Sequence, residues 1–267
     1  MSRGARWFAA LGDEKPSPGA SVLASDVLWN GDRLRLVAVV PNSASRFPRA
    51  RSGQVGIEEG WAIADAVHNA IAEDTHGERR TIVAIVDVPG QAFGYHEEFL
   101  GLHESLAAAA DAYASARAAG HPVIALVVGK AISGAFLAHG LQAAAIIALD
   151  DNALEFHVMS QASVARVTRR GEAEVAALAK VVPSTARDVH SFASLGAIDQ
   201  LLKIQNADAP TARDIDTVKK CLLTTAERLR EQPRNPRDRL LNPSAATSRA
   251  MSIRVRKLLE AQWDAPA

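Results

Sequence analysis

The chain contains little cysteine, few aromatic residues and no excess of charge of either sign. Its 267 residues include a single cysteine, Cys221, so a disulfide within the chain is excluded. Such cysteine usage is typical of a reducing compartment. Basic and acidic residues both number 30, and the zero net charge argues against nucleic acid or an anionic membrane surface as a partner.

Strongly apolar segments are short throughout the sequence. No stretch approaches the roughly 20 apolar residues that cross a bilayer. Near the N-terminus, a short apolar patch is interrupted by Asp13, Glu14 and Lys15, too early for the apolar core of a secretory signal. We therefore expect a soluble, cytoplasmic protein, whose length suits one large domain or two small ones.

Motifs of two common nucleotide-binding folds are also missing. No Gly-x-Gly-x-x-Gly follows the first apolar strand, which disfavours a dinucleotide-binding fold. Gly129-Lys130 is not followed by Ser or Thr and lacks the upstream glycine of a P-loop. The middle of the chain is instead rich in alanine and glycine, which let elements approach closely and leave backbone amides accessible.

The residues that are present predict an α/β fold. Residues 21–40 hold two apolar runs around Asn30-Gly31, a strong hairpin signal. Later apolar runs suit strands buried on both faces, and segments of helical spacing separate them. The predicted later strands are 81–88, 121–129, 145–149 and 153–158. The predicted helices between them are 57–71, 97–119 and 131–143.

Beyond about residue 160 the pattern becomes mainly helical. Residues 211–231 carry a regular apolar stripe surrounded by charge, and residues 230–239 are basic and Pro-rich, as in an exposed link. We expect a single domain over 1–267, with an N-terminal arm at 1–20 and a mainly helical C-terminal part at about 160–267. The predicted helices of this part are 172–182, 187–195, 211–231 and 245–260.

Two stretches carry candidate chemistry, and each follows the end of a buried strand, where ligands gather in α/β folds. In VDVPGQAFGYHEEF (86–99), Gly90 and Gly94 have no side chain to block approach to the backbone. In GKAISGAF (129–136), the amides of Gly134 and Ala135 lie at a helix start without intrahelical acceptors. Two converging amides can stabilise an oxyanion. The alternative, which the residues leave equally open, is a pair of ordinary strand–helix turns.

These two stretches also carry a resemblance. The sequence resembles the carboxyltransferase proteins of the crotonase superfamily in the order of its motifs. Asp-x-Pro-Gly is followed by a further glycine and a glutamate, then by a helix, a strand and Lys-Ala-x-Ser-Gly-Ala. The upstream segment LVAVVPN…GQVGIEEGWAIADAV is similar to the strand, loop and first helix of that family, and the likeness covers about residues 20–160. The Gly-Gln-Ala-Phe-Gly-Tyr loop and the short helical C-terminal part resemble more closely the gamma subunits of biotin-independent malonate decarboxylases.

The resemblance implies a crotonase-type ββα spiral with a C-terminal helical region. It implies a beta subunit, an acyl-carrier subunit and an acyl-carrier transferase subunit as partners, with an active site between the beta and gamma subunits. The reaction would decarboxylate malonyl held as a thioester on the carrier, giving acetyl thioester and CO2. It requires no metal, and no cofactor bound covalently to this chain. The substrate arm would be the carrier's dephospho-CoA-derived prosthetic group or a CoA thioester.

Several residues receive roles from the resemblance. The amides of Gly134 and Ala135 would form an oxyanion hole for the thioester enolate, and Phe93 and Gly94 would line the same pocket. Ser133 stands where the family usually has glycine, so it adds a hydroxyl and leaves the backbone geometry there open. The further candidates for substrate contact are Gly90, Ser133, Tyr95, Arg49 and Arg51. For Arg49 and Arg51, together with Arg46, two interpretations stay open: they contact the phosphates of the substrate arm, or they belong to a plain solvated loop.

Other interpretations remain open. The chain can instead be the matching half of a biotin-dependent acyl-CoA carboxyltransferase, in which the same amides would face the biotin ring oxygen. The sequence has no Met-Lys-Met biotin-attachment site, which agrees with both functions because carriers are often separate chains. Ser133 can be the nucleophile of a serine hydrolase, with Lys130 and His139 nearby. The absence of a Gly-x-Ser-x-Gly elbow and the frequency of helix-capping serines disfavour that role.

The histidines and glutamates after Gly94 have two interpretations. They form an acid/base cluster or metal site, or they are a solvated first helical turn, which is the commoner case. These residues are His96, Glu97, Glu98 and His103. We expect His139 and His157 to be core or interface histidines rather than ligands.

Overall fold

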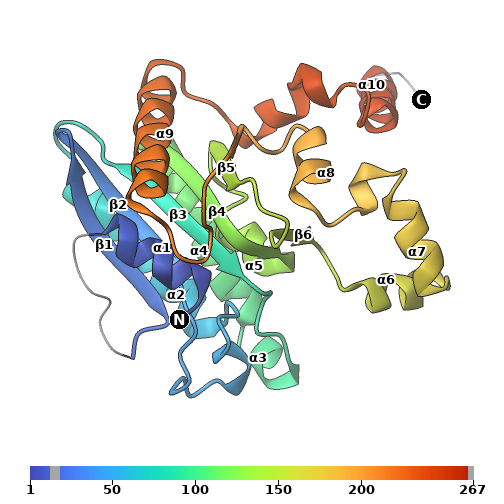
Figure 1. Cartoon of the computed structure of the whole chain (residues 1–267), viewed down its shortest axis with the longest axis horizontal. Coiled ribbons are helices and arrows are strands. Elements are labelled where there is room, and N and C mark those ends of the chain that lie inside the picture. The colour runs from blue at the N-terminus through green and yellow to red at the C-terminus, as the bar shows by residue number, and fades with distance from the viewer. Residues whose placement is uncertain (13–18, 264–267) are drawn as a thin grey trace.

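A computed structural model describes residues 1–12 and 19–263 of the chain. Seven strands of this described part form one sheet, in the order β1-β2-β3-β4-β5-β7, with β6 paired to β4 (Figure 1). β1 and β2 pair antiparallel, and the other pairs are parallel. The strands are β1 (Val22–Trp29), β2 (Asp32–Val39), β3 (Thr81–Val88), β4 (Val123–Ile132), β5 (Ala145–Leu149), β6 (Glu155–His157) and β7 (Gln200–Leu202).

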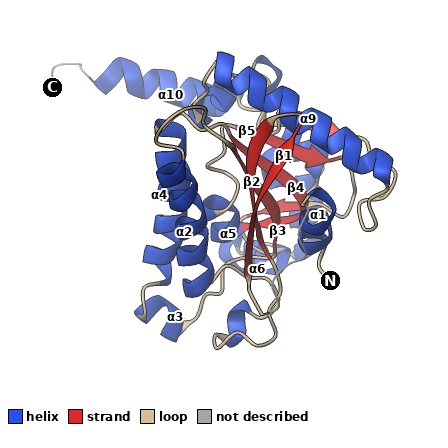
Figure 2. Cartoon of the chain, turned by 90° about the vertical axis from the view of Figure 1, so that its left-hand side faces the viewer, coloured by secondary structure: helices blue, strands red, loops and turns tan. Residues whose placement is uncertain are grey.

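Helices cover both faces of this sheet. In Figure 2, α2 and α4 lie on one side of the strands and α1 and α9 on the other, giving three layers. The helices are α1 (Arg3–Leu11), α2 (Ile57–Glu73), α3 (Tyr95–Phe99), α4 (Leu102–Ala118), α5 (Ser133–Ala138), α6 (Gln161–Thr168), α7 (Glu172–Ala179), α8 (Val189–Ser194), α9 (Ala212–Glu231) and α10 (Ala250–Trp263). Short 3-10 turns are η1 (Pro48–Ala50), η2 (Pro183–Thr185), η3 (Pro236–Leu241) and η4 (Pro243–Ala245). No helix of these described ranges is both long and apolar enough to span a membrane.

The strands form where their residue pattern predicts them. Asn30 and Gly31 have φ of 51° and 93°, as a two-residue hairpin turn requires, so the predicted hairpin is confirmed. β3 and β4 are buried along nearly their whole length, because helices cover both faces of the sheet. On the α2–α4 side, Gly60 allows close packing, since a Cβ there would lie 2.5 Å from the Ser105 carbonyl oxygen.

Two predicted helices differ from the observed elements. The predicted helix 131–143 is wrong at both ends, because β4 continues to Ile132 and α5 ends at Ala138. The chain turns after α5 at Gly140, whose φ of 139° favours glycine. Gly140 also lies close against the Phe136 ring. The predicted helix 97–119 is divided into α3 and α4 at Gly101, whose φ is 92°. Helix α6 and strand β7 were not predicted.

The first residues form a helix that packs on the sheet. The sequence predicts only an arm at 1–20, of which residues 13–18 lie outside the described residues. Trp7 of α1 is fully buried and its indole N–H donates to the Ala207 carbonyl at 2.9 Å. Asp87 of β3 accepts from the Gly4 amide at 2.9 Å and from the Lys130 amide at 3.1 Å. These contacts attach α1 to the two central strands.

The C-terminal part consists mainly of helices, and its link at 230–239 is not simply exposed. Arg239 is buried and donates hydrogen bonds to the carbonyls of Leu141 and Ala143. Arg234 pairs with Asp199 at 2.6 Å. The basic residues therefore attach this segment to the end of the sheet. In Figure 1, α6, α7 and α8 lie together at the side of the sheet where β6 ends.

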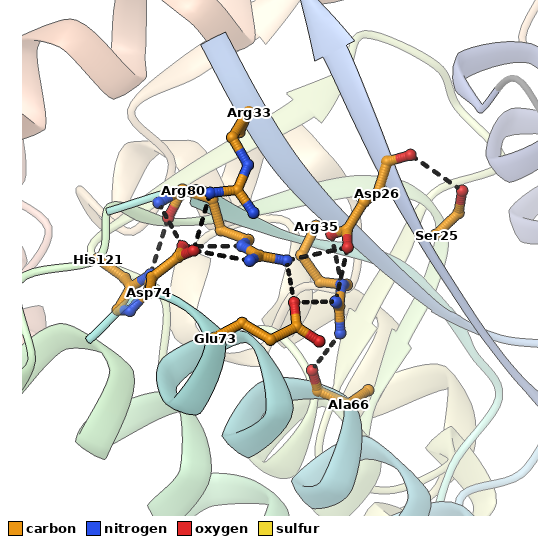
Figure 3. Close-up of polar contacts among 9 residues, drawn as sticks. All are labelled: Ser25, Asp26, Arg33, Arg35, Ala66, Glu73, Asp74, Arg80 and His121. Carbon is orange, nitrogen blue, oxygen red and sulfur yellow. Dashed lines mark hydrogen bonds and ion pairs between the residues drawn. The ribbon is translucent and has the colours of Figure 1, made fainter. Parts of the chain in front are cut away.

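A buried ion cluster joins α2 to the first strands (Figure 3). The Arg80 guanidinium donates to both oxygens of Asp74, at 2.7 and 2.6 Å, and to Asp26 at 2.9 Å. Both Asp74 and Arg80 are fully buried, and Asp74 also accepts from the Arg80 amide at 2.9 Å. Burial alone would raise the pKa of Asp74, but the hydrogen bonds and charge of Arg80 hold it well below its usual value.

His139 lies in the core, as the sequence analysis expects. Its Nε2 faces the Ile85 carbonyl at 3.1 Å, which only accepts, so Nε2 carries the proton. Its Nδ1 therefore accepts from the Tyr113 hydroxyl at 2.9 Å. Burial lowers the pKa of His139 to about 4, because the charged form loses its hydration. The imidazole is a neutral link between α4 and β3.

This histidine predicts a pH dependence of stability. The pKa of His139 falls from 6.5 to about 4 on folding, so the unfolded chain takes up the proton first. The free energy of unfolding should therefore lose about 3 kcal/mol from this group as pH falls from 6.5 to 4. Urea titrations at several pH values measure the loss. His139→Gln, which keeps one acceptor and one donor but does not titrate, should show a shallower dependence. An unchanged slope would contradict the assignment.

Candidate functional site

The two candidate stretches meet at one edge of the sheet. β3 and β4 are parallel neighbours, and Val88 pairs with Ala131 near their carboxyl ends. The loop Pro89–Gly94 leaves β3, and α5 begins directly after β4. Because parallel strands end at the same edge, segments far apart in the sequence come together there. The structure therefore brings the predicted loop beside the predicted amides.

Gly134 is the second residue of α5, and its N–H is directed at a side chain of the other stretch. It donates to Oε1 of Gln91 at 3.0 Å. Ala135, the next residue, is fully buried. The amides in the first turn of a helix have no acceptor within that helix. The oxyanion-hole role of both residues remains a prediction. The contact with Gln91 was not predicted, because sequence spacing does not indicate which side chain crosses between two loops.

Ser133 occupies an unusual backbone conformation. Its φ is 57°, in the left-handed region, which costs a non-glycine residue roughly 1–2 kcal/mol. Glycine adopts this conformation readily, which gives a physical reason for the glycine in the resembling pattern. Ser133 and Gly134 both line the cavity described below.

The strain at Ser133 predicts an unusual order of stabilities. Ser133→Gly should be more stable to unfolding than Ser133→Ala by about 1 kcal/mol, because only glycine relieves the left-handed strain. Chemical denaturation of the two variants measures the difference, with the wild-type protein as reference. If the alanine variant proved the more stable, the left-handed conformation of residue 133 would be refuted.

A cavity of about 680 Å³ opens beside Gly134. Its wall is mostly apolar and comes from the end of the sheet, α5 and the helices α6, α7 and α8. Phe156 and Phe192 stack at 4.4 Å between ring centroids, and Phe136 packs against Phe192 at 6.1 Å. The polar part of the lining includes Gln91, Ser133, Gly134, His157 and Arg187. An apolar cavity with a few converging polar groups is typical of a small-molecule site.

His157 is a partly buried histidine of this cavity wall. β6 places it beside Ile132, the residue before α5. Its Nε2 lies 2.6 Å from the Arg187 guanidinium and 3.2 Å from Oε2 of Glu155. Glu155 contacts the same guanidinium at 3.0 Å. Burial and the Arg187 charge lower the pKa of His157, which favours the neutral ring. Sequence reasoning did not single out Arg187, because the local pattern does not indicate that this residue lies beside His157.

Phe93, Gly94 and Tyr95 are not among the residues that line this cavity. The side chains of Phe93 and Tyr95 are 63% and 82% exposed, on the outer surface of the loop. Gly94 lies against the side chains of Glu97 and Arg49, which would have to shift to admit a Cβ. Gly90 has a φ of 134°. A role of these four residues in substrate contact remains a prediction.

The three arginines of the loop before α2 have partners within the chain. Arg51 donates to the Ser45 carbonyl at 2.9 Å and so supports the loop itself. Arg49 lies 3.6 Å from Glu97, and Arg46 lies 2.6 Å from Glu58. The side chains of Arg49 and Arg46 are 59% and 74% exposed, so their charge is accessible. Contact with phosphates remains a prediction for these residues.

The possible acid/base or metal cluster after Gly94 does not converge on one point. Glu97 is buried rather than solvated, and it pairs with Arg49. His96 packs edge-on against Tyr95, with 5.7 Å between ring centroids. Over residues 1–12 and 19–263, no three His, Cys, Asp or Glu side chains are grouped in a way that could hold a metal ion.

Comparison with known proteins places this arrangement in a family. Residues 50–263 match the family described as malonate decarboxylase gamma subunit. A chain of a Pseudomonas malonate decarboxylase hetero-tetramer is 44% identical, with 98% of this chain and 100% of that chain covered. Its TM-score is 0.91 in the complex with coenzyme A and 0.88 in the complex with malonate.

Two further relatives bear on activity and fold. Malonyl-S-ACP:biotin-protein carboxyltransferase of Malonomonas rubra is 34% identical over 235 residues, which cover 86% of this chain and 77% of that protein. Transcarboxylase 12S, bound to methylmalonyl-coenzyme A, is 21% identical with a TM-score of 0.58, over 80% of this chain and 38% of its own. These neighbours confirm the crotonase-type α/β fold. The chain belongs to the malonate decarboxylase gamma subunit family.

Proposed function

We propose that this chain is the gamma subunit of a malonate decarboxylase. Paired with a beta subunit, it decarboxylates malonyl carried as a thioester on an acyl-carrier protein, giving acetyl thioester and CO2. The observation that carries the proposal is the Gly134 amide, which meets a carbonyl-type oxygen at the edge of an apolar cavity. The full-length likeness to the Pseudomonas enzyme, solved with coenzyme A and with malonate, supports the substrate class.

The chemistry of decarboxylation suits such a site. Loss of CO2 from a malonyl thioester leaves an enolate, whose negative charge develops on the thioester oxygen. Amides aimed at that oxygen stabilise the transition state more than the ground state, which accelerates the reaction. In this chain the amides would be those of Gly134 and Ala135. The apolar wall around them keeps the local dielectric low, so each hydrogen bond to the developing charge is stronger than in water.

A heteromer is supported by apolar side chains left on the surface. The loop and turn around α3 expose Phe93, Tyr95, Phe99 and Leu100, all at least 60% accessible. Helix α10 has no buried residue in the chain and exposes Met251, Val255, Leu258, Leu259 and Trp263. Contiguous exposed apolar surface commonly marks an interaction site. We propose that a beta subunit covers part of it, and that acyl-carrier and carrier-transferase subunits complete a cytoplasmic enzyme.

A second candidate function is transfer of the carboxyl group to a biotin carrier. The relative from Malonomonas rubra, a malonyl-S-ACP:biotin-protein carboxyltransferase, favours it. In that reaction the same amides would stabilise charge on the substrate or on the biotin ring oxygen. The two functions differ in whether a biotin carrier is needed for CO2 release.

One experiment separates these functions. The purified beta–gamma pair is supplied with malonyl-carrier thioester, and CO2 release is measured with and without avidin. Undiminished release supports the biotin-independent decarboxylase, whereas release that needs a biotin carrier and is blocked by avidin supports carboxyl transfer. Ser133→Ala is the control for a serine hydrolase: it should leave decarboxylation within about threefold of wild type. A hydrolase would instead release malonate and lose this activity with the Ser133 hydroxyl.

A further inference from the structure

The Gly134 amide is hydrogen-bonded to the side chain of Gln91. Its Oε1 accepts from that N–H at 3.0 Å, and both residues line the cavity. The oxygen of a glutamine side chain is an sp2 carbonyl oxygen, like that of a thioester. We infer that Gln91 is an internal ligand of the oxyanion site, which occupies the position of the thioester oxygen until substrate displaces it. This inference rests on the proposed function of the Gly134 amide.

The backbone of Gln91 is held in place by a second loop. Gln91 forms a β-bridge with Val55. The Val55 amide donates to the Gly90 carbonyl at 3.1 Å, and the Ala92 amide donates to the Val55 carbonyl at 2.8 Å. Val55 and Ala92 are both buried. Substrate therefore cannot move the main chain of this loop without breaking these bonds, and exchange at Gly134 must come from rotation of the Gln91 side chain.

The surroundings allow that rotation. A cavity of about 680 Å³ adjoins the side chain, and the nearest Gln91 atoms are 3.3 Å from the position of a Cβ on Gly134. This is a contact made by the flexible end of a side chain, so it can be relieved by a rotamer change. While the site is empty, the glutamine satisfies an amide that would otherwise lack a partner in an apolar wall.

An internal ligand competes with substrate, whereas a purely structural cap does not. Removing an internal ligand strengthens substrate binding and leaves the chemical step alone, because the Gly134 amide that serves the transition state is still present. Removing a structural cap loosens the site and weakens binding. The two roles therefore predict opposite changes in KM.

The test uses the assembled beta–gamma pair and the malonyl-carrier thioester as probe. Gln91→Ala should lower KM by about three- to tenfold with kcat within about twofold of wild type, since a net hydrogen bond of ordinary strength no longer competes. Gln91→Glu should raise KM by about tenfold or more, because an ionised carboxylate binds the same N–H more strongly. Gln205→Ala is the matched control. It removes a glutamine whose Oε1 accepts from the Thr211 hydroxyl at 3.3 Å, outside the cavity wall, and should leave KM unchanged.

Failure of this inference is distinguishable from failure of the proposed function. A KM that is unchanged or raised in Gln91→Ala, while CO2 release still depends on the Gly134 amide, overturns the role of Gln91 alone. Absence of avidin-resistant CO2 release from the wild-type pair overturns the proposed function and this inference with it. A lower KM in Gln91→Ala and a higher KM in Gln91→Glu, with the control unchanged, support the internal ligand.

Discussion

Gly134→Pro is expected to lower the rate of CO2 release by the assembled pair by about 100- to 1000-fold, the loss typical of removing one oxyanion donor. Proline has no N–H, so the donor that now meets Gln91 at 3.0 Å would be absent. The first turn of a helix tolerates proline, and α5 begins only one residue earlier. The measurement is kcat with the malonyl-carrier thioester, alongside assembly with the beta subunit by size-exclusion chromatography.

Two further variants separate loss of the donor from a change in shape. Gly134→Ala keeps the N–H, and its Cβ would lie 3.3 Å from Cδ of Gln91, a flexible side chain that can give way. It should retain activity within about tenfold of wild type, well above the proline variant. Proline also restricts the residue before it, and Ser133 already has a strained φ of 57°. In Ser133→Gly, Gly134→Pro, glycine frees that backbone. Recovery of activity in this double variant would attribute the loss to shape rather than to the donor.

The strands were predictable because their signals are local. The hairpin at Asn30-Gly31 follows from the φ that its turn residues prefer, and β3 follows from a β-branched apolar run. The location of the candidate site follows from the same signals, since parallel strands that alternate with helices end at one edge. This is why the sequence alone indicates that the loop after β3 and the turn into α5 lie at the same edge.

The elements that the sequence predicts wrongly are set by contacts between residues far apart in the sequence. The alanine-rich run 131–143 fits a helix by composition, yet its first two residues extend β4, where Ala131 and Ile132 pair with Phe156 and His157 of β6. Such pairing is set by the partner strand and not by the propensity of the run itself. The N-terminal helix was missed for the same reason, because Trp7 is buried by segments that lie far along the chain.

The cavity could not be predicted for the same reason. Its wall joins the end of the sheet to helices that begin after residue 160, so no single stretch of sequence describes it. Arg187 and His157 meet only because β6 and the turn before α8 lie side by side. The hydrogen bond from Gly134 to Gln91 is likewise a contact between two loops. Local pattern therefore indicates where the site is, and tertiary packing decides which side chains line it.

Arg80→Met is expected to lower the free energy of unfolding by about 3–5 kcal/mol, the cost of breaking a buried ion pair from one side. Methionine replaces much of the buried volume but offers no donor. The two oxygens of Asp74 would lose bonds of 2.7 and 2.6 Å while the carboxylate stays fully buried (Figure 3). Urea denaturation of the full-length chain measures the loss.

Arg33→Met is the matched control, because Arg33 pairs with the same carboxylate. Arg33 lies 3.0 Å from Asp74 but is 55% exposed, so water can replace it. Its loss should cost no more than about 1 kcal/mol, as for other surface pairs. The two variants share the acceptor Asp74 and the substitution. They differ in the burial of the donor and in its contacts, since Arg80 also pairs with Asp26 and Glu73.

The expected loss in Arg80→Met comes mainly from the charge left behind on Asp74. Adding Asp74→Asn removes that charge. In the wild-type protein the backbone N–H of residue 80 donates to Asp74 at 2.9 Å, and the side-chain oxygen of asparagine can still accept this bond. The double variant should therefore be more stable than Arg80→Met alone, by roughly 1–3 kcal/mol. Without Arg80, burial raises the pKa of Asp74, so the deficit of the single variant should shrink as pH falls and the carboxyl takes up a proton. Equal losses in Arg80→Met and Arg33→Met, at every pH, would mean that burial does not determine the energy of this pair.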